Sequence, residues 1–161
     1  MPLDPANLEE TDLFSDRIKA PKIDPSIIAK LKKTKLGKLG NYTIYAVDDE
    51  YIRNFIDLDY TIGGNFGRDA YIPEGEIWIS NLLKPSDYAP VLLHEAVETL
   101  LMTKHKLEYE HAHNFANLLE GQFRRRIGNK ELKIKNNKDA FKEANRLVKQ
   151  FLQDALTKVH K

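Results

Sequence analysis

The chain has 161 residues and a formal net charge of +1; 42% of its residues are apolar and 30% are charged. A chain of this length fits one domain of ordinary size, and its apolar share argues against wholesale disorder. It contains no cysteine, which excludes disulfides, thiolate zinc sites, iron–sulfur clusters and a cysteine nucleophile. Any bound metal must therefore be held by His, Asp and Glu side chains.

The sequence predicts neither a membrane span nor a secretion signal. The longest apolar runs, such as Leu100–Met102, fall far below the roughly 20 residues that cross a bilayer. The first residues are acidic and rich in proline, unlike a signal peptide. We therefore expect a cytoplasmic protein with no membrane partner.

Charge is unevenly distributed along the chain. Residues 39–123 hold 5 Lys and Arg against 14 Asp and Glu, whereas residues 124–161 hold 12 against 4. An acidic middle suits a bound cation, and the basic C-terminal region suits contact with nucleic acid or an acidic partner. A solvated helix face is the simpler interpretation of the basic region.

The first predicted elements are an arm, a short helix and a strand. Residues 1–22 contain three prolines and little periodicity, and we interpret them as an extended N-terminal arm ahead of a single domain over residues 23–161. A helix is expected over residues 26–33, and a strand over residues 41–47, which are rich in β-branched and aromatic side chains. Residues 51–62 fit either a helix or a strand, and we favour a strand in their second half.

A turn and a second strand are predicted next. The run Gly-Gly-Asn-Phe-Gly at residues 63–67 has the composition of a flexible turn. Residues 77–80 form a short apolar strand, which we place at a sheet edge because it is brief and follows Pro73.

Three longer helices complete the predicted fold, over residues 88–103, 108–126 and 138–159. The first is expected to follow an N-cap at Ser86 or Asp87, with Pro90 in its first turn. The last has a continuous apolar stripe, which suits a core or a dimer seam. The fold class is therefore predicted to be α+β: a small twisted sheet of about three strands with an edge strand, two helices packed against it and a C-terminal amphipathic helix.

The helix predicted over residues 88–103 carries three polar side chains suited to a metal site. At 100° per residue, His94 and Glu98 lie one turn apart on the same face, so an imidazole and a carboxylate can reach one cation. Glu95 lies about 100° around the helix from His94, close enough to address a water on that cation without ligating it.

The next predicted helix repeats this arrangement. Tyr109, His113 and Glu120 lie on one edge of its apolar stripe, within about 40° of one another. Glu120 lies about 10 Å further along the axis than His113, so we expect one of the two to ligate the cation and the other to hold a ligand in place. The site requires the rings of His94 and His113 to lie within about a dozen ångströms of each other, and His111 is expected at the surface.

Two imidazoles and one carboxylate around an open position form the ligand set of a catalytic zinc site. Zinc would lower the pKa of a water molecule towards 7. Glu95 would accept its proton and pass it to the leaving amine, and Tyr109 would donate a hydrogen bond to the developing oxyanion. An extended peptide would pair with strand 77–80. These residues predict a zinc peptidase.

Four blocks of the sequence resemble a family of small phage-borne and prokaryotic zincin-like proteins. They are residues 59–64, residues 71–79, the run His-Glu-Ala-Val-Glu at residues 94–98, and residues 109–113. The resemblance implies a zincin-like domain and a metallopeptidase activity, in the cytoplasm of a phage-infected host or in a virion. Glu98 stands where the usual His-Glu-x-x-His motif has its second histidine, which moves the metal preference from Zn²⁺ somewhat towards harder ions such as Mn²⁺ or Fe²⁺.

Two other functions remain open from the sequence. The spacing Glu110-x-x-His113 is that of di-iron carboxylate proteins, but the second such motif, Glu108-x-x-His111, overlaps it and points elsewhere. The predicted strands also count against a helical di-iron bundle. The other alternative is a non-catalytic phage structural or interaction protein that retains a zincin-like scaffold.

A purely structural interpretation of the motif is also open. Glu98 would then pair with Lys104 or Lys106, and His94 would be a buried histidine with its hydrogen bonds satisfied.

Overall fold

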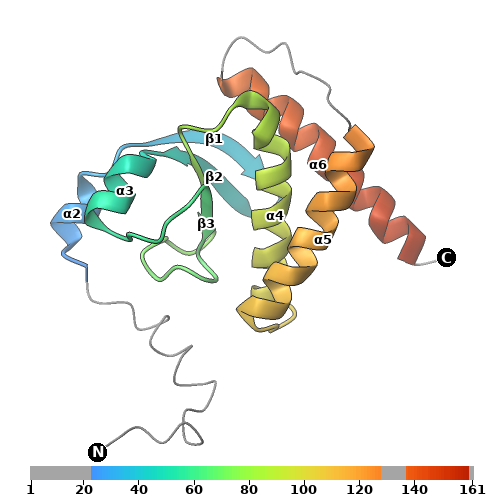
Figure 1. Cartoon of the computed structure of the whole chain (residues 1–161), viewed down its shortest axis with the longest axis horizontal. Helices are drawn as coiled ribbons and strands as arrows, with labels where there is room; N and C mark the ends of the chain where they lie inside the picture. The colour runs from blue at the N-terminus through green and yellow to red at the C-terminus, as the bar shows by residue number, and fades with distance from the viewer. Residues whose placement is uncertain (1–22, 128–136, 160–161) are drawn as a thin grey trace, which may run out of the picture.

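The computed structural model describes residues 23–127 and 137–159. In this part of the chain, helices and one four-stranded sheet combine into an α+β fold, which confirms the predicted fold class (Figure 1). The predicted N-terminal arm, residues 1–22, lies outside the described residues. None of the described helices has the length and apolar content needed to cross a bilayer.

The strands lie in the order β1-β2-β4-β3, with β2 and β4 parallel and the other two neighbouring pairs antiparallel. Strands β1 and β3 are therefore the two edges of the sheet. The elements of the described chain are α2 (Pro25–Ala29), β1 (Lys33–Leu39), β2 (Tyr42–Val47), α3 (Asp49–Phe55), β3 (Gly63–Asn65), β4 (Glu76–Ser80), α4 (Pro85–Thr103), α5 (Tyr109–Ile127) and α6 (Asn137–Val159).

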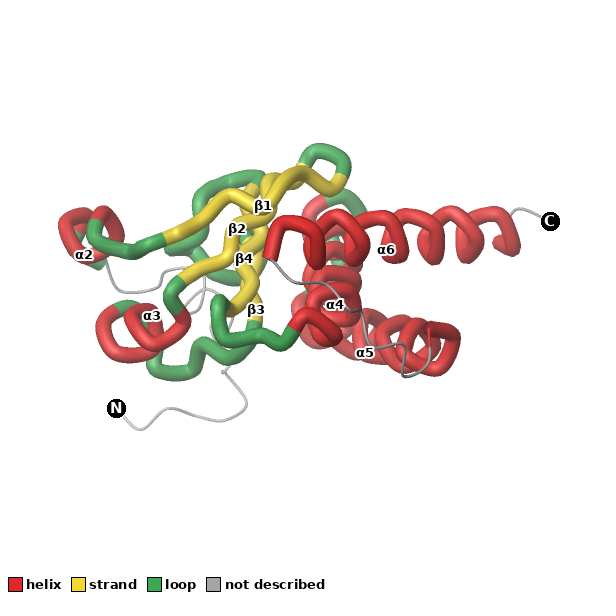
Figure 2. The backbone as a smooth tube through the Cα atoms, turned by 90° about the horizontal axis from the view of Figure 1, so that it is seen from above, coloured by secondary structure: helices red, strands yellow, loops and turns green. Residues whose placement is uncertain are grey.

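The sheet separates two apolar cores. Ile77 and Ile79 of β4 pack in the core that the sheet shares with α4, α5 and α6, whereas Trp78 packs on the other face with Ile52 of α3. Successive strand side chains point to opposite faces of a sheet, so one strand contributes to both cores. Figure 2 shows the resulting layers, with α2 and α3 on one side of the sheet and the three long helices on the other.

The predicted edge position of residues 77–80 is wrong. Strand β4 lies between β2 and β3, and both of its sides are paired. The outer partner is Gly63–Asn65, which the composition had assigned to a turn. Pairing with β4 supplies these residues with backbone partners, and this outweighs the local preference of a Gly-Gly-Asn run for a turn.

Two boundaries near the N-terminal end also differ from prediction. The first helix ends at Ala29, and Lys33, expected to be helical, begins β1 and pairs with Val47 of β2. The predicted strand in the second half of 51–62 is absent from the structure. A helix, α3, occupies the first half instead, because the side chain of Asp48 caps it by accepting a hydrogen bond from the Tyr51 N–H at 3.2 Å.

Helix α4 lies at the centre of the fold, between the sheet and the other two long helices (Figure 1). It begins at Pro85 after Lys84, so the predicted N-cap at Ser86 or Asp87 is wrong and Pro90 falls in the second turn. Proline suits the first helical position because its missing N–H has no partner there in any case. The early start adds a turn to the helix that carries the predicted ligands.

Candidate metal centre

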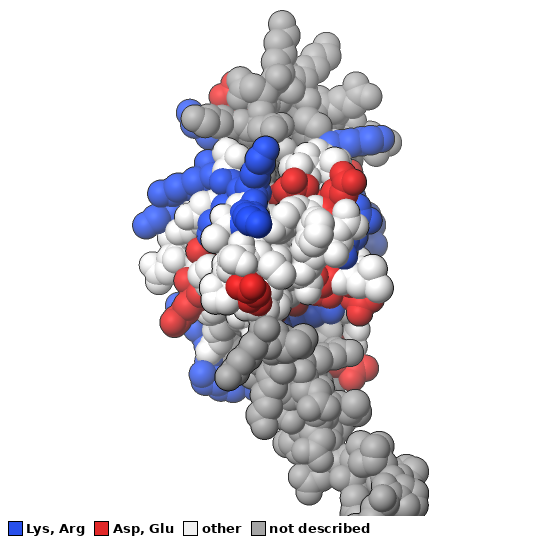
Figure 3. Space-filling view, turned by 90° about the vertical axis from the view of Figure 1, so that its left-hand side faces the viewer, with Lys and Arg blue, Asp and Glu red and all other residues white. Residues whose placement is uncertain are grey.

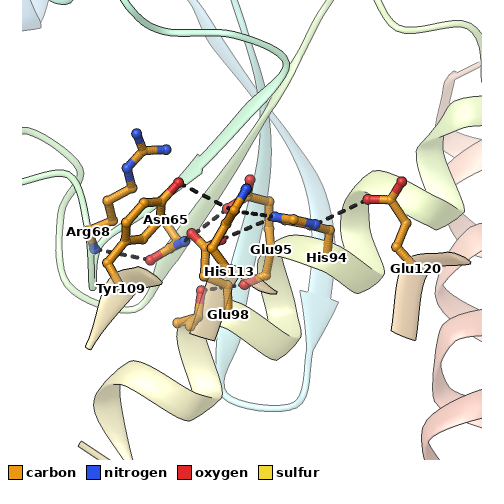
Figure 4. A network of polar contacts seen from close by, with 9 residues as sticks. Asn65, Arg68, His94, Glu95, Glu98, Tyr109, His113 and Glu120 are labelled. Carbon is orange, nitrogen blue, oxygen red and sulfur yellow. Dashed lines mark hydrogen bonds and ion pairs between the residues drawn. The ribbon is translucent and has the colours of Figure 1, made fainter. Parts of the chain in front are cut away.

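Three side chains from α4 and α5 converge on one point (Figure 4). His94 Nε2 lies 3.1 Å from Glu98 Oε2, His113 Nδ1 lies 2.9 Å from the same oxygen, and the two ring nitrogens are 3.2 Å apart. The ring centroids are 4.9 Å apart, well inside the separation that the prediction required. We call His94, Glu98 and His113 the triad; of the residues described, they are the group whose ligand atoms lie together in this way.

The distances between the three ligand atoms of the triad suit a metal ion. An ion that forms four tetrahedral bonds of about 2.0–2.1 Å holds its ligand atoms about 3.3 Å from one another. The three separations in the triad, 2.9, 3.1 and 3.2 Å, lie close to this value. Only one proton can lie between two ring nitrogens, so at least one imidazole turns a lone pair towards the other ligand atoms.

Local geometry and small side chains bring the triad together. His94 and Glu98 are separated by four residues on α4, so one helical turn places them side by side. His113 comes from α5, which reverses direction after α4 and packs along it (Figure 1). Ala112 and Ala116 on the inner face of α5 are completely buried, and their small side chains let the two helix axes approach closely.

Glu120 lies behind His94 and does not join the three converging atoms. Its Oε1 is 3.1 Å from Nδ1 of His94, the ring nitrogen that faces away from the triad, and its other oxygen accepts a hydrogen bond from Arg124 Nε at 3.0 Å (Figure 4). A carboxylate beside Nδ1 favours a proton on that nitrogen and leaves the Nε2 lone pair for a metal. The structure therefore brings three of the four predicted ligands to one point and places the fourth where it orients a ligand.

Tyr109 borders the triad, as the helix geometry predicted. Its Oη is 3.3 Å from His113 Nδ1, and the two ring centroids are 5.2 Å apart. Burial raises the pKa of the Tyr109 phenol to about 12, with the nearby carboxylates adding to the effect. At neutral pH the hydroxyl is therefore protonated and available as a hydrogen-bond donor.

Glu95 is buried beside the triad, where Asn65 of β3 holds it. One amide nitrogen, Asn65 Nδ2, donates to Glu95 Oε2 at 2.9 Å and to Glu98 Oε1 at 3.1 Å. The amide oxygen accepts hydrogen bonds from the backbone N–H groups of Gly67 and Arg68 at 3.0 and 3.2 Å. Burial raises the pKa of the Glu95 carboxyl, and the charge of Glu98 raises it further.

Asn65 was not among the site residues predicted from the sequence. Its run of small residues has the composition of a turn, and the carboxylates that it contacts lie 30 and 33 residues away in the chain. No periodicity reports a contact over that separation. The one available signal was chemical: within the run Gly-Gly-Asn-Phe-Gly, Asn65 has the only side chain that can donate hydrogen bonds to a carboxylate.

The electrostatic surroundings of the triad are compatible with a bound cation. Burial opposes ionisation of Glu98, but hydrogen bonds from His94 and His113 outweigh this and lower its pKa. Burial likewise opposes a charge on His94, but Glu120 and Glu98 outweigh it and raise the pKa of the imidazole to about 10. In the metal-free protein, a proton thus supplies the positive charge that the surrounding carboxylates attract.

The lysine partners expected for Glu98 in the purely structural interpretation are wrong. This carboxylate contacts the two histidines, whereas Lys104 and Lys106 are exposed. The second di-iron motif is not assembled either, because Glu108 and His111 are exposed away from the triad. The surface position predicted for His111 is confirmed.

The described part of the basic C-terminal region is partly neutralised within the fold. Arg124 pairs with Glu120, and Arg126 pairs with Asp154 of α6 at 2.5 Å. On the opposite side of the molecule, the face beside α2 and α3, acidic and basic side chains are interspersed (Figure 3). Neither observation identifies a nucleic acid or an acidic protein as a partner.

Asn65→Asp is expected to lower the free energy of unfolding of the metal-free protein by at least about 2 kcal/mol. The change preserves shape but replaces the shared donor with a third carboxylate beside Glu95 and Glu98. Urea unfolding in the presence of EDTA, followed by the fluorescence of the single tryptophan, Trp78, measures the effect. Asn117→Asp, at an exposed position on α5, is the matched control and should change stability by less than about 0.5 kcal/mol. Equal effects of the two substitutions would contradict the role given to Asn65.

The site thus combines a triad of metal-ligand type, a buried carboxylate held by an amide, and a protonated phenol. No family model, curated protein or solved structure matches this chain.

Proposed function

We propose that this protein is a metal-dependent hydrolase, most simply a zinc peptidase, in which His94, Glu98 and His113 hold the ion. The observation that carries the proposal is the convergence of two imidazole nitrogens and one carboxylate oxygen within 2.9–3.2 Å of one another. Catalytic zinc sites use three protein ligands of these types and keep a further position open for water or substrate.

The accessibility of the triad supports a site that a substrate can reach. The side chain of Glu98 is only 2% exposed, whereas that of His113 is 38% exposed. One end of the triad is thus buried against β3 and the other opens to solvent along α5. Tyr109, on the same side as His113, is partly exposed as well. A substrate that approaches along α5 meets the metal ligands and the phenol together.

The residues around the triad have the roles that hydrolysis requires. A divalent metal held there would supply Lewis acidity and would lower the pKa of a water molecule to about 7. Glu95, held beside Glu98 by Asn65, accepts the proton of the attacking water and passes it to the leaving amine. Tyr109 donates a hydrogen bond to the oxygen on which negative charge develops.

The resemblance to zincin-like proteins becomes part of this proposal. Two features support it. A helix with the motif His-Glu-x-x-Glu is followed in the chain by a helix with the third candidate ligand, and the two helices pack against each other. The route proposed from sequence for a peptide substrate needs revision, because both sides of strand 77–80 are already paired. In the revised proposal, the peptide binds along the side of α5 that carries the partly exposed Tyr109 and His113.

Protein purified without chelator and dialysed against excess zinc is expected to bind about one zinc per chain, because the triad is one complete three-ligand set. Elemental analysis by mass spectrometry measures the stoichiometry, and competition with a chromophoric chelator measures the affinity. Mn²⁺ and Fe²⁺ are titrated in parallel, since two histidines and one carboxylate also form the ligand set of non-haem iron enzymes. Hydrolysis of a casein peptide mixture, lost on chelation and restored by metal, tests the activity.

The stoichiometry separates the competing functions. Two irons per chain would favour a di-iron carboxylate protein. Substoichiometric binding of every metal would favour a non-catalytic protein on the same scaffold. Either result contradicts the proposed hydrolase.

A further inference from the structure

We propose that Arg68 binds a carboxylate of the substrate, so that the metal site acts on peptides with a carboxylate close to the bond that is cleaved. This inference rests on the proposed function and adds the substrate class to it. It starts from the position of one arginine beside the triad, which the sequence analysis did not single out.

The guanidinium of Arg68 stacks on the ring that borders the triad. Its Cζ lies 4.2 Å from the centroid of the Tyr109 ring, and Tyr109 in turn lies beside His113, with 5.2 Å between the ring centroids (Figure 4). Arginine is weakly hydrated and stacks well on aromatic faces, which fixes its planar group while leaving its N–H donors free to bind. The stack therefore presents a cation next to the candidate metal position.

Arg68 is partly buried but has no carboxylate partner at ion-pair distance within the described residues. Four other arginines each pair with an acidic side chain of the fold, namely Arg53, Arg124, Arg126 and Arg146. Arg125, which shares the lack of such a pair, is exposed on α5. The carboxylates of Glu95, Glu98 and Asp69 act on Arg68 only at longer range. Its guanidinium is partly buried and its hydrogen-bonding capacity is open to a ligand.

The fold holds Arg68 in this place. Its backbone N–H donates to Asn65 Oδ1 at 3.2 Å, and that of Gly67 donates to the same oxygen at 3.0 Å. A Cβ on Gly67 would lie only 3.2 Å from Asn65 Oδ1 and 3.3 Å from the side chain of Thr103, so the loop packs tightly against the end of α4. The amide that positions Glu95 and Glu98 thus also positions the loop that carries Arg68.

The chemistry of the surroundings favours a carboxylate as the ligand. A guanidinium binds a carboxylate through two parallel hydrogen bonds. A multiply charged anion such as a phosphate is disfavoured, because Glu95 and Glu98 are nearby. The guanidinium and the His113 ring both lie close to the Tyr109 ring, at 4.2 and 5.2 Å from its centroid, and an extended chain advances about 3.3–3.6 Å per residue. The bound carboxylate therefore lies within a few residues of the scissile bond, either as the C-terminal carboxylate or as an acidic side chain.

A pair of hydroxamate probes tests this without turnover. One is the monohydroxamate of succinic acid, which has a free carboxylate, and the other is its neutral amide counterpart. Isothermal titration into the zinc-loaded protein is expected to show at least about a 10-fold preference for the carboxylate probe, from one charge-assisted bidentate contact. Arg68→Gln should abolish the preference, so that the two probes bind equally well. Arg68→Lys keeps the positive charge but cannot form the two parallel hydrogen bonds, so it should retain part of the preference.

Two controls make the outcome specific. Arg146→Gln, the same change at an exposed arginine of α6, should keep the full preference. Zinc stoichiometry, measured on each variant, shows that the triad is intact. A preference that survives in zinc-loaded Arg68→Gln, or is missing from the wild-type protein, overturns this inference alone. Failure of the wild-type protein to bind zinc overturns the proposed function and this inference with it.

Peptides then distinguish the two sources of the carboxylate. The probes are acetyl-Gly-Gly-Leu with a free C-terminus, its C-terminal amide, and acetyl-Gly-Glu-Leu amide, whose only carboxylate is a side chain. Arg68-dependent binding of the first peptide assigns the site to a C-terminal carboxylate, and Arg68-dependent binding of the third assigns it to an acidic side chain. Equal binding of all three peptides to the zinc-loaded wild-type protein contradicts the proposal.

Discussion

Replacing His94 by alanine is expected to abolish stoichiometric zinc binding. The change removes one of the three converging ligand atoms and leaves Glu98 Oε2 and His113 Nδ1 alone, 2.9 Å apart. The dissociation constant should rise by well over 100-fold, since even residues that only orient a ligand change metal affinity by about 10–100-fold. Competition with a chromophoric chelator measures this constant for both proteins.

A surface histidine supplies the matched control for this experiment. His111 lies on the same helix as His113 but is exposed, so His111→Ala should bind zinc like the wild type. His113→Ala is a second test variant, because its side chain is 38% exposed and its removal leaves a smaller defect in the core than removal of His94. Zinc binding that persists in both His94→Ala and His113→Ala would rule out the triad as the metal site.

Glu95→Gln and Glu98→Gln are expected to have opposite effects, although the two carboxylates share one amide donor, Asn65. Glu95→Gln should lower the rate of peptide hydrolysis by about 10²–10⁴-fold, the range for loss of a general acid–base group, and should leave zinc bound. Glu98→Gln should instead release the zinc, because an amide oxygen is a much weaker ligand than a carboxylate. Elemental analysis and a peptide cleavage assay on the same preparations separate the two roles.

Stability provides an independent measurement on the same pair. Glu95 is a buried carboxylate whose ionisation the surroundings oppose, so Gln at this position removes an unfavourable charge. The metal-free Glu95→Gln protein is therefore expected to melt at the same temperature as the wild type or higher, as is common when a catalytic group is removed. Loss of zinc from Glu95→Gln would show that Glu95 is a ligand and would contradict its role as the base.

The side chain of Asn65 connects the sheet with the helix that carries the candidate ligands. From the edge strand β3, its amide reaches two carboxylates of α4 and also the loop that carries Arg68. Asn65→Asp is therefore expected to disturb the loop that carries Arg68 as well as the two carboxylates of α4. Substitutions at Arg68 should leave zinc binding intact, whereas substitutions at Asn65 should weaken both zinc binding and the preference for a carboxylate ligand.

The local half of the site was predictable from the sequence. His94 and Glu98 lie one helical turn apart, and Tyr109 and His113 lie one turn apart on the next helix. These relations follow from the 3.6-residue period, which acts over a few residues and does not depend on the rest of the fold. Amphipathic patterns likewise located α4, α5 and α6, with errors mainly at their ends.

Tertiary packing alone decided the rest. The choice of His113 over Glu120 at the convergence point depends on how closely α5 approaches α4, and the buried Ala112 and Ala116 set that distance. The edge position of β3, and with it the place of Asn65, depends on pairing with β4, which outweighs the turn preference of Gly-Gly-Asn. Helical periodicity is a property of a few neighbouring residues, whereas strand pairing and helix contact join segments tens of residues apart, and their geometry is set only when the whole core packs.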